Sequence, residues 1–209
     1  MNKRLLPVLL LSALLPAGAL LSACSTTGAA QESAAAAAPC TIAEGSDANG
    51  ALLQAAKEGD AKNARCLLAG GANANTADGE GFTALMLAAG RGHTAIVKNL
   101  IDKGAQPNTA YKDGTTALMT AAASGYTDAA RLLLERGANI NAANDKGATA
   151  LSIAALQGHA DTVRLLIAQG ANVNAVITKG KAAGHTPLAI AQANGHTAIV
   201  EMLRAAGAK

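Results

Sequence analysis

The sequence lacks the short motifs that mark most catalytic sites. It contains no G-x-S-x-G, no phosphate-binding loop and no Cys/His spacing of the kind that holds a metal ion. These absences argue against an enzyme. We therefore expect no cofactor, no bound metal and no small-molecule substrate.

Clustered basic charge is absent as well. The formal net charge is +3, and it falls to +1 if the first 23 residues are removed, because Lys3 and Arg4 are lost. Nucleic-acid binding needs basic residues gathered on one face. We therefore expect no nucleic-acid partner.

The first apolar run is too short to cross a membrane as a helix, which takes about 20 residues. It covers residues 5–21, is interrupted by Pro7 and Pro16, and follows the positive residues Lys3 and Arg4. A positive start before a short apolar segment is typical of a secretory signal. We predict that residues 1–23 are a signal peptide.

The signal ends in a motif that resembles the bacterial lipobox. Residues 21–24 read Leu-Ser-Ala-Cys, with two small residues directly before Cys24. The resemblance implies cleavage before Cys24 and acylation of its thiol and new amino group. Several acyl chains, at about 0.8 kcal/mol per buried methylene, give a lasting membrane anchor. Ordinary secretion with a chance cysteine and an uncleaved anchor are the alternatives, and the position of Cys24 after the small pair argues against both.

Residues 24–47 are rich in alanine, serine, threonine and glycine and have little apolar surface to bury. This composition is typical of a flexible linker. We predict a tether between the lipid and the folded domain, and the alanines are compatible with a transient helical turn.

From residue 48 onward the chain repeats itself. A Thr-Ala-Leu or Thr-Pro-Leu triplet begins at 83, 116, 149 and 186, a step of 33 residues twice and then 37. A Gly-His or Gly-Tyr pair and a Gly-Ala pair recur in the same register. Self-similarity at this period indicates a stacked array of small units.

Each unit predicts two short helices. Thr116 is placed to cap a helix that Gly125 ends, and a second helix begins near Thr127 and ends at Gly137. Helices of roughly 8 to 10 residues cannot bury their apolar faces alone, so each pair must pack against the next. The sequence therefore predicts an all-α solenoid.

The unit resembles the ankyrin repeat. The matching pattern, G-x-T-A-L-x-x-A-A-x-x-G-x-x-x-x-x-x-x-L-L-x-x-G-A-x-x-N, runs from Gly114 to Asn141. The family's Thr-Pro-Leu-His opening is complete nowhere, so the resemblance does not extend to the hydrogen bonds that its histidine makes between repeats. It implies a domain over 48–209, with about five helix-turn-helix repeats and loop fingers, at about 48–78, 79–111, 112–144, 145–183 and 184–209.

Two cysteines, Cys40 and Cys66, remain if Cys24 is lipidated. An even pair in an oxidising compartment favours a disulfide. We predict that this bridge joins the tether's end to the second helix of the first repeat and stabilises the fold by roughly 3 kcal/mol. The alternative is that Cys66 is a small core residue.

The remaining polar candidates are interpreted as structural. Stacked helices lie roughly 8 to 10 Å apart, which keeps histidines of successive repeats too distant to share a metal ion. In the family this histidine position helps to tie the turn, and aspartate is common in loop turns. The residues concerned are His93, His159 and His196, and Asp78, Asp113 and Asp145.

The loop tips and the exposed faces of the first helices form the surface that such arrays present. Phe82 and Tyr111, two of only three aromatic residues, fall in this region. Aromatic and arginine residues are the usual anchors of protein interfaces. Phe82 packing only its own loop is the alternative. We predict that the partner contacts Phe82, Arg91, Tyr111, Lys112, Lys146 and Leu156.

The four extra residues before the last repeat lie within 176–183. Insertions in such arrays go to loops on one face, often the binding face. Lys179, Lys181 and an apolar Ile177 near the loop tip are therefore further candidates, and a tolerated solvated loop is the alternative.

The sequence as a whole predicts a lipid-anchored protein-binding module in the periplasm of a bacterium with two membranes. In related lipoproteins a residue such as Ser25 after the lipidated cysteine sends the molecule to the outer membrane, here to its inner leaflet. The protein would hold a periplasmic enzyme or neutralise a rival's toxin as an immunity protein. A structural envelope lipoprotein without one tight partner is the alternative of another class.

Overall fold

The computed structural model describes Cys40 and residues 47–209. The predicted signal peptide, the lipidation site Cys24 and most of the tether lie outside the described residues. The described residues form ten helices: α1 (Ala48–Glu58), α2 (Ala61–Ala69), α3 (Ala84–Ala89), α4 (Thr94–Asp102), α5 (Ala117–Ser124), α6 (Thr127–Glu135), α7 (Ala150–Gln157), α8 (Ala160–Ala168), α9 (Pro187–Ala193) and α10 (Thr197–Ala205).

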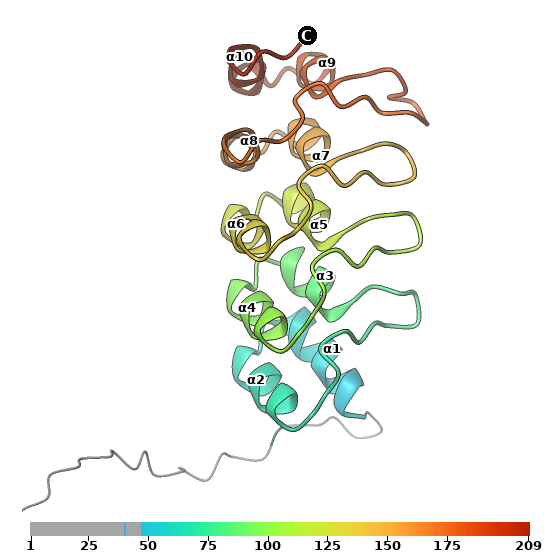
Figure 1. The fold of residues 1–209 in the computed structure, drawn as a ribbon, viewed down its shortest axis with the longest axis vertical. Coiled ribbons are helices and arrows are strands. Elements are labelled where there is room, and N and C mark those ends of the chain that lie inside the picture. Colours follow the sequence, from blue (N-terminus) through green and yellow to red (C-terminus); the bar gives the residue numbers. More distant parts are fainter. Residues whose placement is uncertain (1–39, 41–46) are drawn as a thin grey trace, which may run out of the picture. The chain divides into compact units, whose positions relative to one another are not determined.

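The helices stack as five hairpins, one per repeat (Figure 1). The odd-numbered helices, called first helices here, form one layer, and the even-numbered second helices form another. Each first helix contacts the first helix of the next repeat, and each second helix contacts the second helix of the next repeat. The predicted all-α solenoid of about five helix-turn-helix repeats is confirmed.

Four loops project beside the first helices, and we call them fingers (Figure 1). Finger 1 is 77–83, finger 2 is 110–116, finger 3 is 143–149 and finger 4 is 176–186. Each finger leads directly into the first helix of its repeat, so the position of every finger is set by the helix that follows it.

The threonine that opens each of these first helices caps it as the sequence predicted. In α5 the hydroxyl of Thr116 accepts a hydrogen bond from the N–H of Met119, which satisfies one of the free donors of the first turn. At the other end Gly125 takes the left-handed conformation, with φ 75°, and stops the helix. Thr83, Thr149 and Thr186 make the same cap in α3, α7 and α9.

The core follows the repeat register. The leucine at the second position of successive first helices is buried each time: the exposed fraction is 2% at Leu85, 1% at Leu118, 0% at Leu151 and 8% at Leu188. Pairs of buried alanines later in α3, α5 and α7 add little bulk and allow close packing. The predicted stacking through equivalent leucines is therefore confirmed.

Histidines at the helix-helix turns join neighbouring repeats. The ring of His159 donates to the carbonyl oxygen of Ala123 in the preceding first helix, with Nε2 3.1 Å from the oxygen. A structural role for these rings is confirmed, but each ring reaches the repeat before its own. His93 and His196 bind Lys57 and Leu156 in the same way, at 3.4 and 3.2 Å.

Asparagines make a second set of links between repeats, on the segments that follow the second helices. The side chain of Asn75 accepts from the N–H of Gln106 and donates to the carbonyl of Gly104, both in the next repeat. These bonds satisfy loop backbone groups that would otherwise need water. Equivalent links run from Asn108 to Gly137 and Asn139, from Asn141 to Asn172, and from Asn174 to Lys209.

Cys40 lies against the first repeat. Its sulfur is at bonding distance from that of Cys66 on α2, and the two Cα atoms are 5.6 Å apart. Disulfides commonly span about 4.4 to 6.8 Å between Cα atoms. The geometry suits the bridge expected from the sequence, and the bond in the folded protein stays a prediction that a thiol count tests.

Candidate partner-binding surface

The fingers are built from few but well-placed hydrogen bonds. Single antiparallel bridges close the base of fingers 1 to 3. At the turn of finger 1, the carboxylate of Asp78 accepts hydrogen bonds from the N–H groups of Glu80, Gly81 and Phe82, at 3.1, 3.0 and 2.9 Å. In finger 3 the side chain of Asn144 accepts hydrogen bonds from backbone N–H groups in the same manner. Asn144 lies one repeat period after Tyr111. The finger backbone is thereby fixed before any partner binds.

Two finger aspartates are held in their charged form. Partial burial acts to raise the pKa of Asp78, but the N–H groups of Phe82, Glu80 and Gly81 together lower the pKa below its ordinary value. The pKa of Asp113 is also lowered, mainly by the hydroxyl of Thr115 and further by the nearby charge of Lys146. Both carboxylates are therefore ionised at neutral pH.

The two predicted aromatic anchors contact each other. The rings of Phe82 and Tyr111 stack with centroids 4.1 Å apart and planes 21° from parallel. Both side chains are half-buried and pack against the edge of the core. Phe82 therefore does more than pack its own loop, because it joins finger 1 to finger 2, and part of each side chain still faces solvent.

The other predicted contacts divide into two groups. Lys112 and Lys146 are both exposed. Lys112 lies in finger 2, directly after Tyr111 in the chain, and Lys146 lies in finger 3, in the next repeat. Arg91 follows α3 and is exposed, and Leu156, near the end of α7, is 47% exposed. These last two lie at the ends of their helices away from the fingers, so the six residues do not form one compact patch. Their contact with a partner stays a prediction.

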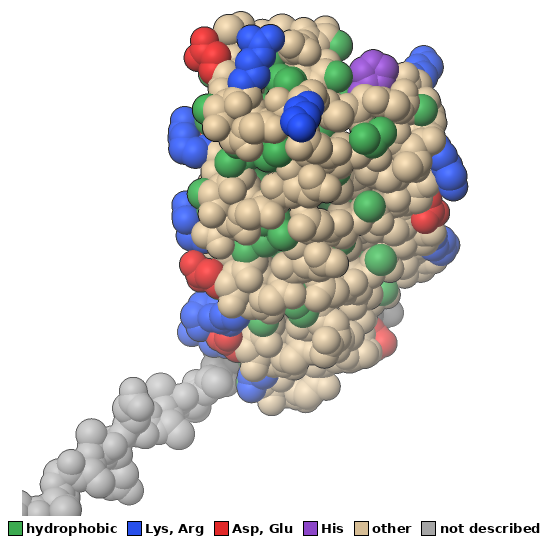
Figure 2. Space-filling view, turned by 45° about the horizontal axis from the view of Figure 1, so that its top comes forward, with side chains coloured by type: hydrophobic (Ala, Val, Ile, Leu, Met, Phe, Trp, Pro, Cys, Tyr) green, Lys and Arg blue, Asp and Glu red, His purple; other side chains and the backbone are tan. Residues whose placement is uncertain are grey.

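The first helices next to the fingers carry no charge. Helices α3, α5, α7 and α9 contain no Asp, Glu, Lys or Arg. Leu87 and Ile153 on these helices are half-buried. In Figure 2 the charged side chains gather along the two edges of the array, and few lie between them.

The expectation for Ile177 was wrong. Its exposed fraction is 8%, because its N–H donates to the carbonyl of His185 and its carbonyl accepts from Gly184, which closes finger 4 over the side chain. Its neighbour Val176 is 47% exposed instead. Finger 4 also rests on finger 3, since the N–H groups of Thr178 and Lys179 both donate to the carbonyl of Lys146.

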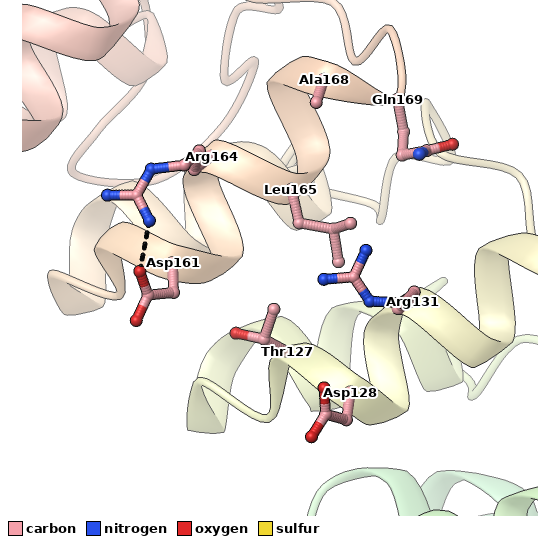
Figure 3. Close-up of a pocket in the computed structure, with 8 residues that line it drawn as sticks. All are labelled: Thr127, Asp128, Arg131, Asp161, Arg164, Leu165, Ala168 and Gln169. Carbon is pink, nitrogen blue, oxygen red and sulfur yellow. Dashed lines mark hydrogen bonds and ion pairs between the residues drawn. The ribbon is translucent and has the colours of Figure 1, made fainter.

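Two surface features on other sides of the array are not among the residues predicted from the sequence. Tyr126 is 41% exposed and its ring lies over Gly92, at the position that histidine holds in other turns. A hollow of about 500 Å³ lies between α6 and α8 (Figure 3). The recurrence of a basic residue every 33 positions, at Arg65, Lys98, Arg131 and Arg164, is the signal that marks this side of the array in the sequence.

The hollow does not favour one ligand charge. Arg164 on its rim is paired with Asp161 at 2.5 Å, and the guanidinium of Arg131 lies beside Leu165 (Figure 3). Asp128 adds a second carboxylate, so the hollow carries two charges of each sign. Over the described residues, no three His, Cys, Asp or Glu side chains are grouped closely enough to hold a metal ion.

None of the helices that the structure describes is both long and apolar enough to span a bilayer.

Comparison with known families identifies the repeat. The description of ankyrin repeats, in three copies, matches residues 52–144 and 138–209. The two matches together extend from within α1 to the end of the chain. No curated protein matches the sequence.

Proposed function

The chain belongs to the ankyrin repeat family, whose repeats serve in protein–protein interaction, and from this premise we propose that it binds one partner protein along the fingers and first helices. An ankyrin repeat domain is typically a non-catalytic binding module. The observation that carries the proposal is the contrast between the uncharged layer formed by α3, α5, α7 and α9 and the exposed residues that border it. Lys112 and Lys146 border it on the finger side, and Leu156 on the other.

The physical case for this side is that it is rigid and open. The finger turns are held by internal hydrogen bonds to Asp78 and Asn144, so little conformational entropy is lost when a partner docks. The stacked pair of Phe82 and Tyr111 offers a preformed aromatic platform, which is the kind of residue that dominates interface energies.

We further propose that the protein works in the periplasm, attached by lipid to the inner leaflet of the outer membrane. The support is the sequence alone: a short signal, small residues before Cys24, and Ser25 after it. A flexible tether over 24–47 has a root-mean-square reach of roughly 25 to 30 Å. The array would thus hold a periplasmic partner, such as an enzyme, close to the membrane surface.

Capture from the native envelope tests the binding proposal. The whole protein is cross-linked in intact cells, purified, and compared with the variant Phe82→Ala/Tyr111→Ala. Tyr126→Ala is the matched control, because it also removes an exposed aromatic ring but on another side of the array. One partner that is lost in the double variant and kept in the control supports the proposal. An empty capture, or one that the double variant leaves unchanged, contradicts it and favours a structural envelope role.

The anchor has a separate test. Cys24→Ala removes the acylated thiol, so the variant is expected in the soluble periplasmic fraction while the unchanged protein partitions with membranes. A Cys24→Ala protein that still partitions with membranes contradicts the lipid anchor and leaves the binding proposal intact.

A further inference from the structure

The charges of the fingers are sorted along the array. Finger 1 carries Asp78 and Glu80 and no basic residue, whereas finger 4 carries Lys179 and Lys181 and no acidic one. Fingers 2 and 3 each carry one lysine and one aspartate, which are Lys112 with Asp113 and Lys146 with Asp145. We call the side of the array formed by the four fingers the finger edge. Its charge therefore changes from two negative charges at finger 1, through the neutral fingers 2 and 3, to two positive charges at finger 4. In Figure 2 the finger edge shows acidic side chains at its lower end and basic ones at its upper end.

None of the finger charges forms an ion pair within the described part of the chain, although Lys57 lies near enough to Asp78, and Lys146 to Asp113, to lower the pKa of each carboxyl. The three ion pairs recorded there all involve the second helices or the residue that follows one: Lys98 with Asp102, Arg136 with Asp102, and Arg164 with Asp161. Glu80, Lys179 and Lys181 are exposed. The described ion pairs thus lie on the second-helix side, and the charges of the fingers remain available to a partner.

The two charged ends act independently of each other. Successive repeats stack at about 10 Å, which puts fingers 1 and 4 roughly 30 Å apart. Exposed charges are largely screened beyond about 8 Å at physiological ionic strength. A partner must therefore present its own opposite charges at both ends of the surface, because one charged cluster cannot reach both.

Between the ends the surface carries no net charge. The floor is made of α3, α5, α7 and α9, which contain no charged residue, and fingers 2 and 3 are neutral overall. Half-buried Leu87 and Ile153 and the exposed Leu156 lie in this region or at its border. A charged group placed against α3, α5, α7 or α9 would lose hydration without gaining a counter-ion from the helix.

Building on the proposed binding function, we infer that the partner segment is itself charge-sorted, basic at the end that meets finger 1, acidic at the end that meets finger 4, and uncharged between. To span roughly 30 Å as a helix, the segment needs about 20 residues. Docking in the opposite direction would place like charges together at both ends, so the charge order also fixes the orientation of the partner.

Two synthetic peptides test this inference. Both are 20-residue helix-forming peptides of the same composition. One has three lysines at its first end and three glutamates at its last, with alanine, leucine and glutamine between them; the other has the six charges interspersed. Binding to the whole chain in nonionic detergent is measured by fluorescence anisotropy. The sorted peptide is expected to bind about tenfold more tightly at low salt, and the difference shrinks as salt screens the charges.

Charge reversal on the protein locates the effect. Lys179→Glu/Lys181→Glu makes both ends of the finger edge acidic and is expected to remove the preference for the sorted peptide. Lys62→Glu/Lys103→Glu on the second-helix side changes the net charge by the same amount and is expected to leave the preference unchanged. Equal binding of the two peptides, no binding of the sorted one, or an equal loss in both protein variants overturns the inference.

The envelope capture separates this inference from the function beneath it. If Phe82→Ala/Tyr111→Ala no longer captures the partner but Lys179→Glu/Lys181→Glu captures it fully, the proposed binding function is supported and the charge-sorted partner is refuted. A partner that is lost in both finger variants and kept by Lys62→Glu/Lys103→Glu supports both.

Discussion

At the scale of single residues, the turns between helices depend on glycines that accept a ring from the next repeat. Gly125 has φ 75°, and a Cβ there would lie 2.6 Å from the ring of His159. Gly137 has a similar φ of 84°, but nothing lies within 4 Å of its Cβ position. The two glycines share the backbone requirement and differ in the ring contact.

We expect Gly125→Ala to cost more stability than Gly137→Ala. Each change places an alanine in the left-handed region, which costs about 1 to 2 kcal/mol. Gly125→Ala also displaces the His159 ring and its hydrogen bond to Ala123, worth about 1 kcal/mol more. Urea unfolding of the two variants measures the difference, and equal losses would show that the ring contact adds nothing.

Asp78 makes the stability of finger 1 dependent on pH. Its pKa is lower in the folded protein than the ordinary value of 3.8. The stabilisation is therefore complete above that ordinary value and is lost as pH falls through the folded pKa. Asp78→Asn is expected to change stability little at pH 7, because Asn144 supports finger 3 with the same kind of side chain.

The same variant is expected to flatten the loss of stability below about pH 4. Thermal midpoints at pH 7 and pH 3 measure it, with Asp145→Asn as the control for removing one negative charge at an exposed finger tip. If Asp78→Asn loses as much stability in acid as the unchanged protein, the carboxylate at this turn is not the cause.

At the scale of elements, the helices were predictable because each depends on residues of its own repeat. The cap at Thr116, the stop at Gly125 and the buried Leu118 all lie within about ten residues of one another, and their recurrence fixed the register. The contact of Phe82 with Tyr111 was not predictable in the same way, since it joins two fingers whose conformations the repeat pattern does not set. The sequence therefore placed Phe82 and Tyr111 in loops but did not predict that their rings stack.

The inserted segment is the clearest case of a structure that the sequence alone did not predict. Ile177 was expected near an exposed loop tip because it lies in an insertion, yet backbone bonds to Gly184 and His185 turn it inward. No local pattern encodes those bonds, because the insertion occurs once and has no second copy for comparison. Hydrophobicity alone would have favoured burial of either Val176 or Ile177.

The predicted bridge between Cys40 and Cys66 would tie the segment before α1 to α2. The two cysteines are 26 residues apart in sequence, and a loop of that size stabilises a fold by about 3 kcal/mol when it is closed. Cys40→Ser is expected to lower the free energy of unfolding by about this amount and to make the protein insensitive to reductant. Two reactive thiols at Cys40 and Cys66 in the denatured, unreduced protein would rule the bridge out.

At the scale of the whole molecule, the array has no centre, because each hairpin contacts only its neighbours. The stability of such a stack is close to a sum of the terms for the hairpins and their interfaces. Interior hairpins such as α5 and α6 have two interfaces, whereas α9 and α10 have one. The exposed fraction of the register leucine is 1% at Leu118 and 8% at Leu188, whereas Leu52 in the N-terminal hairpin is 0% exposed.

This arrangement predicts that the array opens from its C-terminal end. Amides of α9 and α10 are expected to exchange hydrogen through openings of lower free energy than those of α5 and α6. The N-terminal hairpin also has only one interface, but the predicted bridge from Cys40 to Cys66 would tie it. We therefore expect α1 and α2 to exchange more slowly than α9 and α10 until reductant is added. Hydrogen exchange followed by mass spectrometry, with and without reductant, measures all three groups in one experiment.

Uniform exchange over the ten helices would mean that the stack unfolds as a single cooperative unit, and finger 4, with its two lysines, would then be as firmly held as finger 2. If instead the C-terminal end opens first, the basic end of the finger edge is the part of the surface that a partner stabilises most on binding.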